Sequence, residues 1–546
     1  MLNIHQKYCR ETFYDGQLVG FEPVYQPDFN FAYDVVDVIA EKEPVRRAML
    51  WCNEAGEEHT FTFSEISKAS NRAANLFSSL GISRGDRVLL ILKRHYQFWF
   101  ALLGLHKLGA VGIPATNQLT KKDIAYRCNA AGIKAVICTT DGDVAEHVDT
   151  ALPECPTVEI KISVHGKHAD WVDFDKEYLK YSDEFKRVET LASDPMLIYF
   201  TSGTTGMPKM VCHDFTYPIA HIVTAKYWQN VVPDGLHLTI SDTGWMKSMW
   251  GKLYGQWFME AGIFVCDFDR FHAEQILPLF AKYQITTFCA PPTMYRFFIK
   301  EDLSKYDLSS LQHASIAGEP LNPEVFNQFY KATGLRLMEG FGQSETTLLL
   351  YNPVGTKPKP GSTGRPNPCY AVDLVDAQGR TVPTGEVGEI VVRTDKGKPV
   401  GLFDGYYRDE ERTRSAWHDG IYHTGDTAWQ DEDGYFWYIG RNDDIIKSSG
   451  YRIGPFEIES VLMEHPAVLE CAITGVPDPI RGQVVKATIV LSRGYEASDE
   501  LKKELQNYVK KQTAPYKYPR IIEFVAELPK TISGKVRRVE IRGGMD

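Results

Sequence analysis

Residues 87–114, RVLLILKRHYQFWFALLGLHKLGAVGIP, are the stretch that decides the fold class. The apolar run at 87–93 predicts a buried strand, residues 96–108 carry apolar side chains at helical spacing, and 110–114 form a second apolar run. A strand, a helix and a strand in this order predict a βαβ unit with a parallel sheet.

The same alternation continues on both sides of this unit. Upstream, residues 63–80 predict a helix that starts with a capping-box pattern, with Ser64, Glu65 and Ser67 in its first turn, and stops at Gly81. Downstream, apolar runs beside helical segments predict buried strands at 134–139, 197–200, 262–268, 285–290 and 314–317.

The pattern of predicted secondary structure changes in the last third of the chain. After about residue 366, short alternating runs with turn signals predict an antiparallel β subdomain, and the last hundred residues return to mixed helix and strand. The polar stretch 441–444 lies between the β subdomain and the C-terminal region of mixed helix and strand, and is the expected domain boundary. We therefore predict an α/β protein with a large N-terminal domain, 1–441, built of parallel-rich αβ subdomains plus a β subdomain, and a small α+β domain, 442–546.

Composition narrows the class of protein. With 546 residues and 43% apolar content the chain can bury several cores. Its ten cysteines are scattered singly, without zinc-ligand spacing, which favours free thiols in a reducing compartment. The polar amino terminus shows no signal-peptide pattern, so we expect a cytoplasmic location.

Charge and hydropathy exclude two kinds of partner. The net charge of -11 leaves no basic face, which argues against nucleic acid as the main partner. The most apolar long stretch, 96–115, is broken by His106, Lys107 and several glycines, and falls short of the roughly 20 apolar residues that a membrane span requires. We expect it in the core.

A loop rich in glycine and hydroxyl residues, TSGTTGMPK at 201–209, follows the strand expected at 197–200. Glycines let backbone N–H groups approach a polyphosphate, hydroxyls donate to its oxygens, and the lysine neutralises charge. It is not a Walker loop, because the spacing differs and Pro208 blocks the helix that should begin there. On composition alone, residues 201–209 could equally form a surface turn with no role in phosphate binding. The candidate residues are Thr201, Ser202, Gly203, Thr205 and Gly206, with Thr204 and Lys209 expected to act in catalysis.

The loop does not stand alone. YFTSGTTGMPK resembles the triphosphate loop of the adenylate-forming, or AMP-binding, superfamily, which includes acyl-CoA synthetases, luciferases and adenylation domains. Similar motifs follow in the family's order over most of residues 60–540: SIAGEP at 315–320, EGFGQSET at 339–346, YHTGD at 422–426, YIGRNDDIIKSSGYRIGPFEIE at 438–459 and PKTISGK at 529–535. The pattern is closest to the medium-chain acyl-CoA synthetases.

The resemblance implies an acid-thiol ligase. Such an enzyme joins a carboxylic acid to AMP with ATP, transfers the acyl group to CoA, releases AMP and pyrophosphate, and uses Mg2+. By the same matching, Glu345 would hold Mg2+, Asp426 and Arg441 the ribose hydroxyls, and Lys535 would bridge the acid and the α-phosphate. Taken alone, each would more often be a solvated loop, turn or surface residue.

Further positions carry implied roles. In the nucleotide site, Gly318, Glu319 and Pro320 would border the adenine, and Gln343 and Thr346 would approach the nucleotide. Arg452 would orient the phosphate. Asp443 would be the hinge of a mobile C-terminal domain, and Gly450 would leave room for the pantetheine arm of CoA.

The acyl pocket is expected around SDTGWMKSMWGKLYGQW at 241–257. Its candidate walls are Trp245, Lys247, Trp250, Cys289 and Gly342, although aromatic residues at such spacing are as often plain core. Acetate-specific relatives carry tryptophan at the position of Gly342, so glycine implies a larger acid: short to medium in chain length, with branched and aromatic acids included. The ammonium of Lys247 is costly in an apolar pocket unless it is paired, is hydrated or meets a polar group of the substrate.

Three rival functions share part of this pattern. An enzyme that loads a carrier-protein thiol would share most motifs, and a light-emitting oxidase would share the fold. A non-catalytic nucleotide-binding protein should have lost Glu345 or Lys535, and both are present. The expected partners are therefore a small carboxylic acid, ATP and CoA; the oligomeric state does not follow from the sequence.

Overall fold

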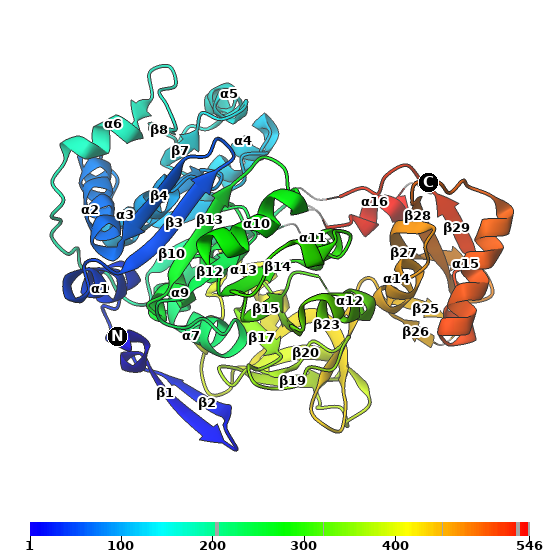
Figure 1. Ribbon diagram of the computed structural model, residues 1–546. Coiled ribbons are helices and arrows are strands. Elements are labelled where there is room, and N and C mark those ends of the chain that lie inside the picture. Colours follow the sequence, from blue (N-terminus) through cyan, green and yellow to red (C-terminus); the bar gives the residue numbers. More distant parts are fainter. Residues whose placement is uncertain (202–206, 320, 450, 531–534, 544–546) are drawn as a thin grey trace.

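The computed structural model describes residues 1–201, 207–319, 321–449, 451–530 and 535–543. A large body built from the first four fifths of the chain carries a smaller C-terminal body at one side (Figure 1). The large body contains two broad sheets and an antiparallel β subdomain, and the small body contains one further sheet. Near the start of the chain β1 (Cys9–Tyr14) and β2 (Gln17–Pro23) form a separate hairpin.

The first broad sheet contains the predicted βαβ unit. Its order is β21-β11-β10-β6-β5-β7-β8-β9, and β5 pairs in parallel with both β6 and β7. Every residue of α3 (Gln97–Leu108) is buried, which confirms that the most apolar stretch of the chain is core. The strands are β5 (Arg87–Ile91), β6 (Val111–Pro114), β7 (Ala135–Thr139), β8 (Ile160–Val164), β9 (Val172–Asp173), β10 (Pro195–Thr201), β11 (Lys209–Asp214) and β21 (Gly405–Tyr406).

The second broad sheet has a parallel centre and antiparallel edges. Its order is β18-β17-β16-β15-β14-β12-β13-β3-β4, and β3 and β12 to β16 run in parallel. The strands are β3 (Arg47–Asn53), β4 (Glu58–Thr62), β12 (Leu236–Thr239), β13 (Gly262–Asp267), β14 (Thr287–Ala290), β15 (His313–Ile316), β16 (Leu337–Gly342), β17 (Leu348–Tyr351) and β18 (Arg365–Pro366).

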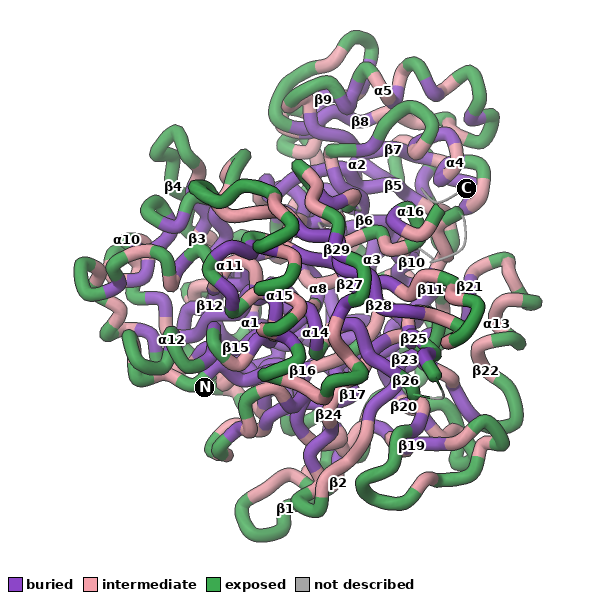
Figure 2. The backbone as a smooth tube through the Cα atoms, turned by 90° about the vertical axis from the view of Figure 1, so that its right-hand side faces the viewer, coloured by how far each residue is buried: buried purple, intermediate pink, exposed green. Residues whose placement is uncertain are grey.

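Helices cover these sheets, and the backbone tube shows buried strands inside exposed loops (Figure 2). They are α1 (Val38–Lys42), α2 (Phe63–Ser79), α4 (Lys121–Ala131), α5 (Val144–Ala151), α6 (Phe174–Glu177), α7 (Tyr217–Val223), α8 (Met246–Gly251), α9 (Tyr254–Phe258), α10 (Ala273–Tyr283), α11 (Pro292–Phe298), α12 (Pro323–Thr333) and α13 (Glu410–Ala416).

The start of α2 differs from the prediction. Its N-cap is Thr62, two residues before Ser64: the Thr62 hydroxyl accepts from the Glu65 N–H at 3.2 Å, and the Glu65 carboxylate accepts from the Thr62 N–H at 2.8 Å. The cap must have an extended backbone so that its oxygen can turn back onto the first helical turn. Thr62 ends strand β4 in this conformation, whereas Ser64 already lies inside the helix.

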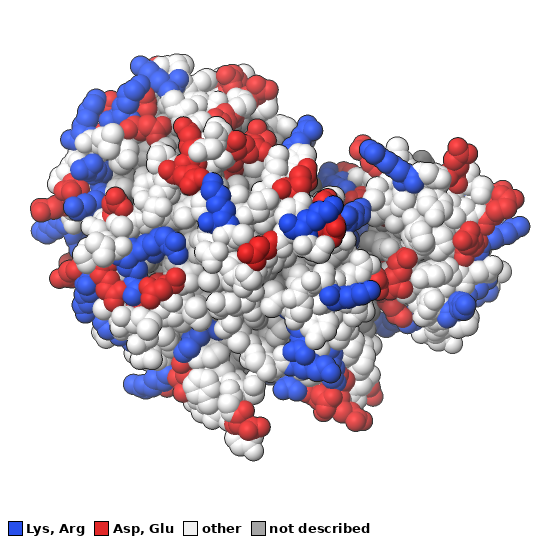
Figure 3. Space-filling model, viewed as in Figure 1, with Lys and Arg blue, Asp and Glu red and all other residues white. Residues whose placement is uncertain are grey.

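The antiparallel β subdomain predicted after residue 366 is confirmed. It contains β19 (Ala371–Val375), β20 (Val387–Arg393), β22 (Trp417–His418), β23 (Ile421–Gln430) and β24 (Phe436–Arg441). On the face shown in Figure 3, acidic and basic side chains are interspersed over both bodies.

The small body is an α+β unit with its own apolar core. It contains β25 (Ile446–Ser448), β26 (Tyr451–Ile453), β27 (Val468–Asp478), β28 (Gly482–Leu491), β29 (Ile521–Phe524), α14 (Pro455–Met463), α15 (Asp499–Gln512) and α16 (Arg538–Gly543). The stretch 442–445 joins β24 to β25, and a domain division at 441/442 stays a prediction. Of the helices described, none is both long and apolar enough to cross a membrane.

Candidate active site

Three of the family-like segments follow parallel strands at their carboxyl ends. Thr201 ends β10, residues 317–319 follow β15, and residues 343–346 follow β16. β10 belongs to the first broad sheet, and β15 and β16 belong to the second. In open α/β sheets, ligands bind outside the carboxyl ends of the strands. Of the predicted site residues, Ser202, Gly203, Thr204, Thr205, Gly206, Pro320 and Gly450 lie outside the described residues.

Lys209, Tyr406 and Glu345 form a row. The Lys209 ammonium donates to the Tyr406 hydroxyl at 3.3 Å, and this hydroxyl donates to Glu345 Oε1 at 2.8 Å. Burial lowers the pKa of Lys209, and the charge of Glu345 opposes this shift. The row places a cation and a buried carboxylate on either side of one phenol.

The sequence analysis missed Tyr406. Its ring lies 4.9 Å from the Lys209 ammonium because β21 pairs antiparallel with β11, the strand that Lys209 begins. The two residues are 197 positions apart, and only the sheet topology brings them together.

A second cluster surrounds Asp426, whose side chain is almost fully buried. Its carboxylate accepts from the Tyr438 hydroxyl at 2.9 Å and from Gln343 Nε2 at 2.5 Å. Arg441 lies 3.9 Å from Asp426 and 3.3 Å from Asp443. Burial raises the pKa of Asp426 to about 6, although Arg441 opposes the shift. The structure thus brings the predicted ribose pair together, and Tyr438 is a further member that the sequence did not reveal.

Lys247 is paired with the backbone. Its ammonium donates to the Ala317 carbonyl at 2.5 Å, beside Gly318, and lies 5.9 Å from the centre of the Trp250 ring. Burial lowers its pKa, and Glu319 and Lys535 act on it as well. The hydrogen bond accounts for an ammonium at this position without any polar group on the substrate.

Lys535 belongs to the C-terminal body yet faces this site. Its charge lowers the pKa values of both Lys247 and Asp426, after the larger effect of burial on each. The two groups belong to different parts of the large body, and the charge of Lys535 acts on both.

Other predicted residues are placed differently. Thr346 is fully buried and uses its hydroxyl inside its own loop, accepting from the Gln343 N–H at 3.1 Å and donating to the Thr347 carbonyl at 2.8 Å. Glu319 accepts from Thr293 at 3.2 Å. Arg452 is exposed on β26 and, within the ranges that the structure describes, makes no contact with these clusters.

The candidate acyl walls are mostly buried. Trp250 and Cys289 are buried, Trp245 is partly exposed, and Trp250 packs against Trp228 with ring centres 5.6 Å apart. At Gly342 a Cβ atom would lie 2.2 Å from the Thr347 carbonyl oxygen. The turn before Glu345 therefore requires glycine on its own account, and the link between Gly342 and pocket size stays a prediction.

Comparisons with known proteins agree with this arrangement. A model described as AMP-binding enzyme matches residues 36–407, and one described as AMP-binding enzyme C-terminal domain matches 457–535. The chain belongs to the AMP-binding enzyme family. Among its members, acyl-coenzyme A synthetase ACSM3, mitochondrial, of Mus musculus is 44% identical over 526 residues, which cover 94% of this chain and 90% of the relative. The ACSM5 enzyme of Homo sapiens is 43% identical over 524 residues, with the same two coverages.

Solved structures of this family have the same fold. The anthranilate CoA ligase AuaEII in complex with anthranoyl-AMP has a TM-score of 0.85 at 27% identity, covering 95% of this chain and 98% of that one. The acyl-CoA synthetase of Brucella canis has a TM-score of 0.73 at 31% identity, with 95% of each chain covered. These similarities confirm the predicted fold class and the prediction of an AMP-binding acyl-CoA synthetase.

One expectation is wrong. The sequence analysis placed the protein in the cytoplasm, whereas the most similar curated relatives are named as mitochondrial enzymes. The signal-peptide pattern concerns secretion alone, so it could not distinguish the cytoplasm from the mitochondrion.

Proposed function

We propose that this acyl-CoA synthetase activates a short-to-medium carboxylic acid larger than acetate, branched and aromatic acids included, as an acyl-adenylate. It then transfers the acyl group to CoA and releases AMP and pyrophosphate. Two neighbours in the family support the acid class, since they are named as ligases for anthranilate and benzoate.

The convergence of cations carries the proposal. A free carboxylate is a poor electrophile, and its attack on the α-phosphate of ATP brings two anions together, so fixed positive charges must offset their repulsion. Four cations come from four segments. Lys209 interacts with Glu345, Arg441 and Lys535 interact with Asp426, and the charge of Lys535 also acts on Lys247. We assign Lys535 to the reacting oxygens and Lys209 to the leaving pyrophosphate.

The carboxylate of Glu345 fits a magnesium ligand. Its side chain is buried, and within the described part of the chain Tyr406 is the one donor to its oxygens, through Oε1. The second oxygen retains acceptor capacity, as a hard cation requires. Bound there with ATP, Mg2+ would neutralise phosphate charge. Tyr406 orients the carboxylate, and Asp426 with Arg441 would hold the ribose hydroxyls.

We further propose that residues 442–546 rotate about Asp443 between the two half-reactions. Lys535 faces the candidate nucleotide site, whereas Arg452 is exposed, which fits an orientation for adenylation. Arg542 donates to the Asp443 carbonyl at 3.2 Å, so the hinge is tied to α16 and must break this contact to turn. Gly450 is assigned to the CoA channel after rotation.

A panel of C2 to C10 linear, branched and aromatic acids tests the proposal. AMP and pyrophosphate release is measured with and without CoA for the wild type and Lys535→Ala. We expect acid-dependent pyrophosphate release that the variant loses, and CoA-dependent AMP release with acids larger than acetate.

Other outcomes assign other functions. ATP consumption that CoA never accelerates would indicate a carrier-protein thiol as acceptor. No acid-dependent turnover would indicate a binding role, and preference for acetate would contradict the acid class.

A further inference from the structure

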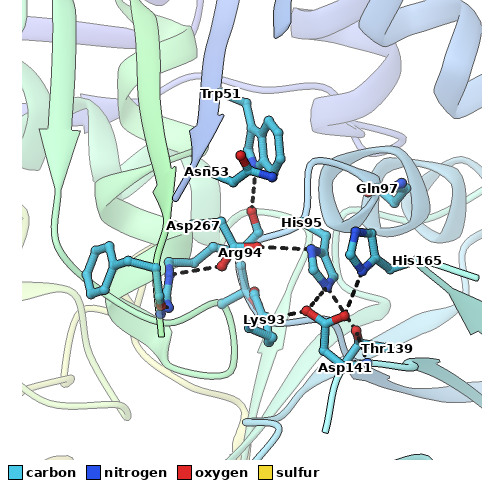
Figure 4. Close-up of polar contacts among 12 residues, drawn as sticks. Trp51, Asn53, Lys93, Arg94, His95, Gln97, Thr139, Asp141, His165 and Asp267 are labelled. Carbon is cyan, nitrogen blue, oxygen red and sulfur yellow. Dashed lines mark hydrogen bonds and ion pairs between the residues drawn. The ribbon is translucent and has the colours of Figure 1, made fainter. Parts of the chain in front are cut away.

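A histidine and aspartate cluster lies outside the candidate active site, where three neighbouring parallel strands end. His95 follows β5, Asp141 follows β7 and His165 follows β8, and these strands are adjacent in the sheet. Their loops therefore meet at one edge, and in Figure 4 both imidazoles point toward the Asp141 carboxylate. The proposed adenylation chemistry uses none of these residues.

The three side chains present one possible ligand atom each within 4.8 Å of one another. His165 Nδ1 lies 2.6 Å from Asp141 Oδ1, and His95 Nε2 lies 3.5 Å from Asp141 Oδ2. The two rings stack with centres 4.6 Å apart. His95 is buried whereas His165 is exposed, so the cluster has a fixed inner side and an open outer side.

The buried histidine, His95, is held in its orientation by a carboxylate on the side of its ring away from Asp141. Its Nδ1 lies 3.0 Å from Oδ2 of Asp267, a buried carboxylate at the end of β13 in the other broad sheet. An Nδ1–H donated to Asp267 leaves the Nε2 lone pair directed at Asp141, and the Thr139 hydroxyl, 2.8 Å from Nε2, can donate to it. A carboxylate behind a histidine is the arrangement that fixes ligating histidines in metal sites.

The local charge is not balanced by fixed cations. Lys93 pairs with Asp141 at 3.0 Å and with Asp269 at 2.9 Å, and Arg94 lies 3.4 Å from Asp242 and 3.6 Å from Asp267. Burial lowers the pKa of Lys252 to about 7, and this third cation also acts on Asp242 and Asp267. Four carboxylates against two full cations and one that is partly charged near pH 7 leave between one and two negative charges among these residues. In addition, Asp267 Oδ1 is buried without a hydrogen-bond partner among the described residues. One divalent cation would neutralise the excess.

We propose that His95 Nε2, His165 Nδ1 and Asp141 form a binding site for a divalent transition-metal ion of the Zn2+ class. Two imidazole nitrogens and one carboxylate favour such an ion over Mg2+, which prefers oxygen alone. Its entry displaces the Nδ1 proton of His165 and the Thr139 hydrogen bond at His95 Nε2. The neutral His165 ring then keeps one proton on Nε2, any second proton leaves to solvent, and Asp141 Oδ2 keeps its contact with Lys93. The exposed side of His165 is the path of entry.

The site would brace the start of the candidate acyl-pocket segment. The Thr243 hydroxyl donates to the Lys93 carbonyl, and Asp242 pairs with Arg94, so the loop that carries His95 is bound to the residues just before Trp245. Metal binding at this loop would hold that segment in place from outside the reaction centre.

Co2+ binding to untagged, chelator-treated protein tests the site directly. The visible absorption of bound Co2+ reports nitrogen and oxygen ligation and does not depend on enzyme activity. We expect one equivalent to bind to the wild type, Zn2+ to displace it, and His165→Ala to weaken binding by at least about tenfold. Asp267→Asn, which leaves all three ligands in place, should weaken it by about 10-fold to 100-fold.

The matched control is His168→Ala. His168 lies three residues after His165 but pairs with Asp149 at 2.8 Å, outside the cluster, so its variant should bind Co2+ as the wild type does. Unchanged binding in His165→Ala, or no specific Co2+ spectrum in the wild type, would overturn the proposal.

Discussion

The pH dependence of nucleoside binding at Asp426 is the sharpest consequence of the candidate ribose site. Burial raises the pKa of this carboxyl to about 6 from an ordinary value of 3.8. The ionised fraction therefore falls as the pH falls through 6, from about 90% at pH 7 to about 10% at pH 5. If only the carboxylate accepts both ribose hydroxyls, affinity should fall about tenfold over this range, or about 1.4 kcal/mol.

Adenosine is the suitable ligand for this measurement. It carries both ribose hydroxyls but no phosphate, so the ligand itself does not titrate between pH 5 and 7. Dissociation constants from calorimetry at several pH values, with circular dichroism to show that the protein stays folded, give the slope. Asp426→Asn should bind adenosine weakly and with no pH dependence in this range, because the amide does not ionise.

A second buried carboxyl provides the control. Burial also raises the pKa of Asp404 to about 6, but this group pairs with Lys398, away from the candidate ribose site. Asp404→Asn should keep the tenfold slope of the wild type. A slope that persists in Asp426→Asn, or its absence from the wild type, would refute the assignment of Asp426 to the ribose.

Three substitutions test other parts of the site. Tyr406→Phe removes the donor to Glu345 and should slow pyrophosphate release about 10-fold to 100-fold, since hydrogen bonds to charged groups contribute about 1.5–3 kcal/mol, while adenosine binding stays unchanged. Gly342→Ala places a methyl group against a carbonyl oxygen, an overpacking that costs about 1–3 kcal/mol, and should reduce pyrophosphate release with every acid, whereas a role in pocket size alone would affect only the larger acids. Lys247→Met removes the donor to the Ala317 carbonyl and should raise the KM for ATP several-fold in steady-state assays.

Local patterns predicted most of the fold. The apolar runs that we assigned to strands, from 87–93 to 314–317, are strands in the structure, because a parallel strand buried on both faces needs a continuous apolar run. The error at Thr62 is of a different kind. Ser, Thr and Glu recur around 62–67, and which residue caps depends on where strand β4 ends, a property of the sheet and not of the local pattern.

The partners inside the site could not be predicted in the same way. Motif matching named Lys209, Glu345 and Asp426, but not the roles of the tyrosines that contact them. Tyr406 lies outside every quoted motif, and Tyr438 begins the motif at 438–459 without a role assigned to it. The proposed metal cluster shows the same limit, since His95 and His165 are far apart in the chain and lack zinc-ligand spacing. Adjacent strands bring their loops together, and adjacency follows from sheet order.

Repulsion between Lys247 and Lys535 suggests how a bound substrate could change the preferred position of the C-terminal body. The charge of Lys535, on the C-terminal body, lowers the pKa of Lys247, so the two ammonium groups repel each other. An anion between them, such as the carboxylate of the acid or the α-phosphate, would convert this repulsion into attraction on both sides. If the C-terminal body rotates as proposed, binding of the anionic substrates would favour closure for adenylation, and loss of negative charge at the end of the first half-reaction would favour release of Lys535.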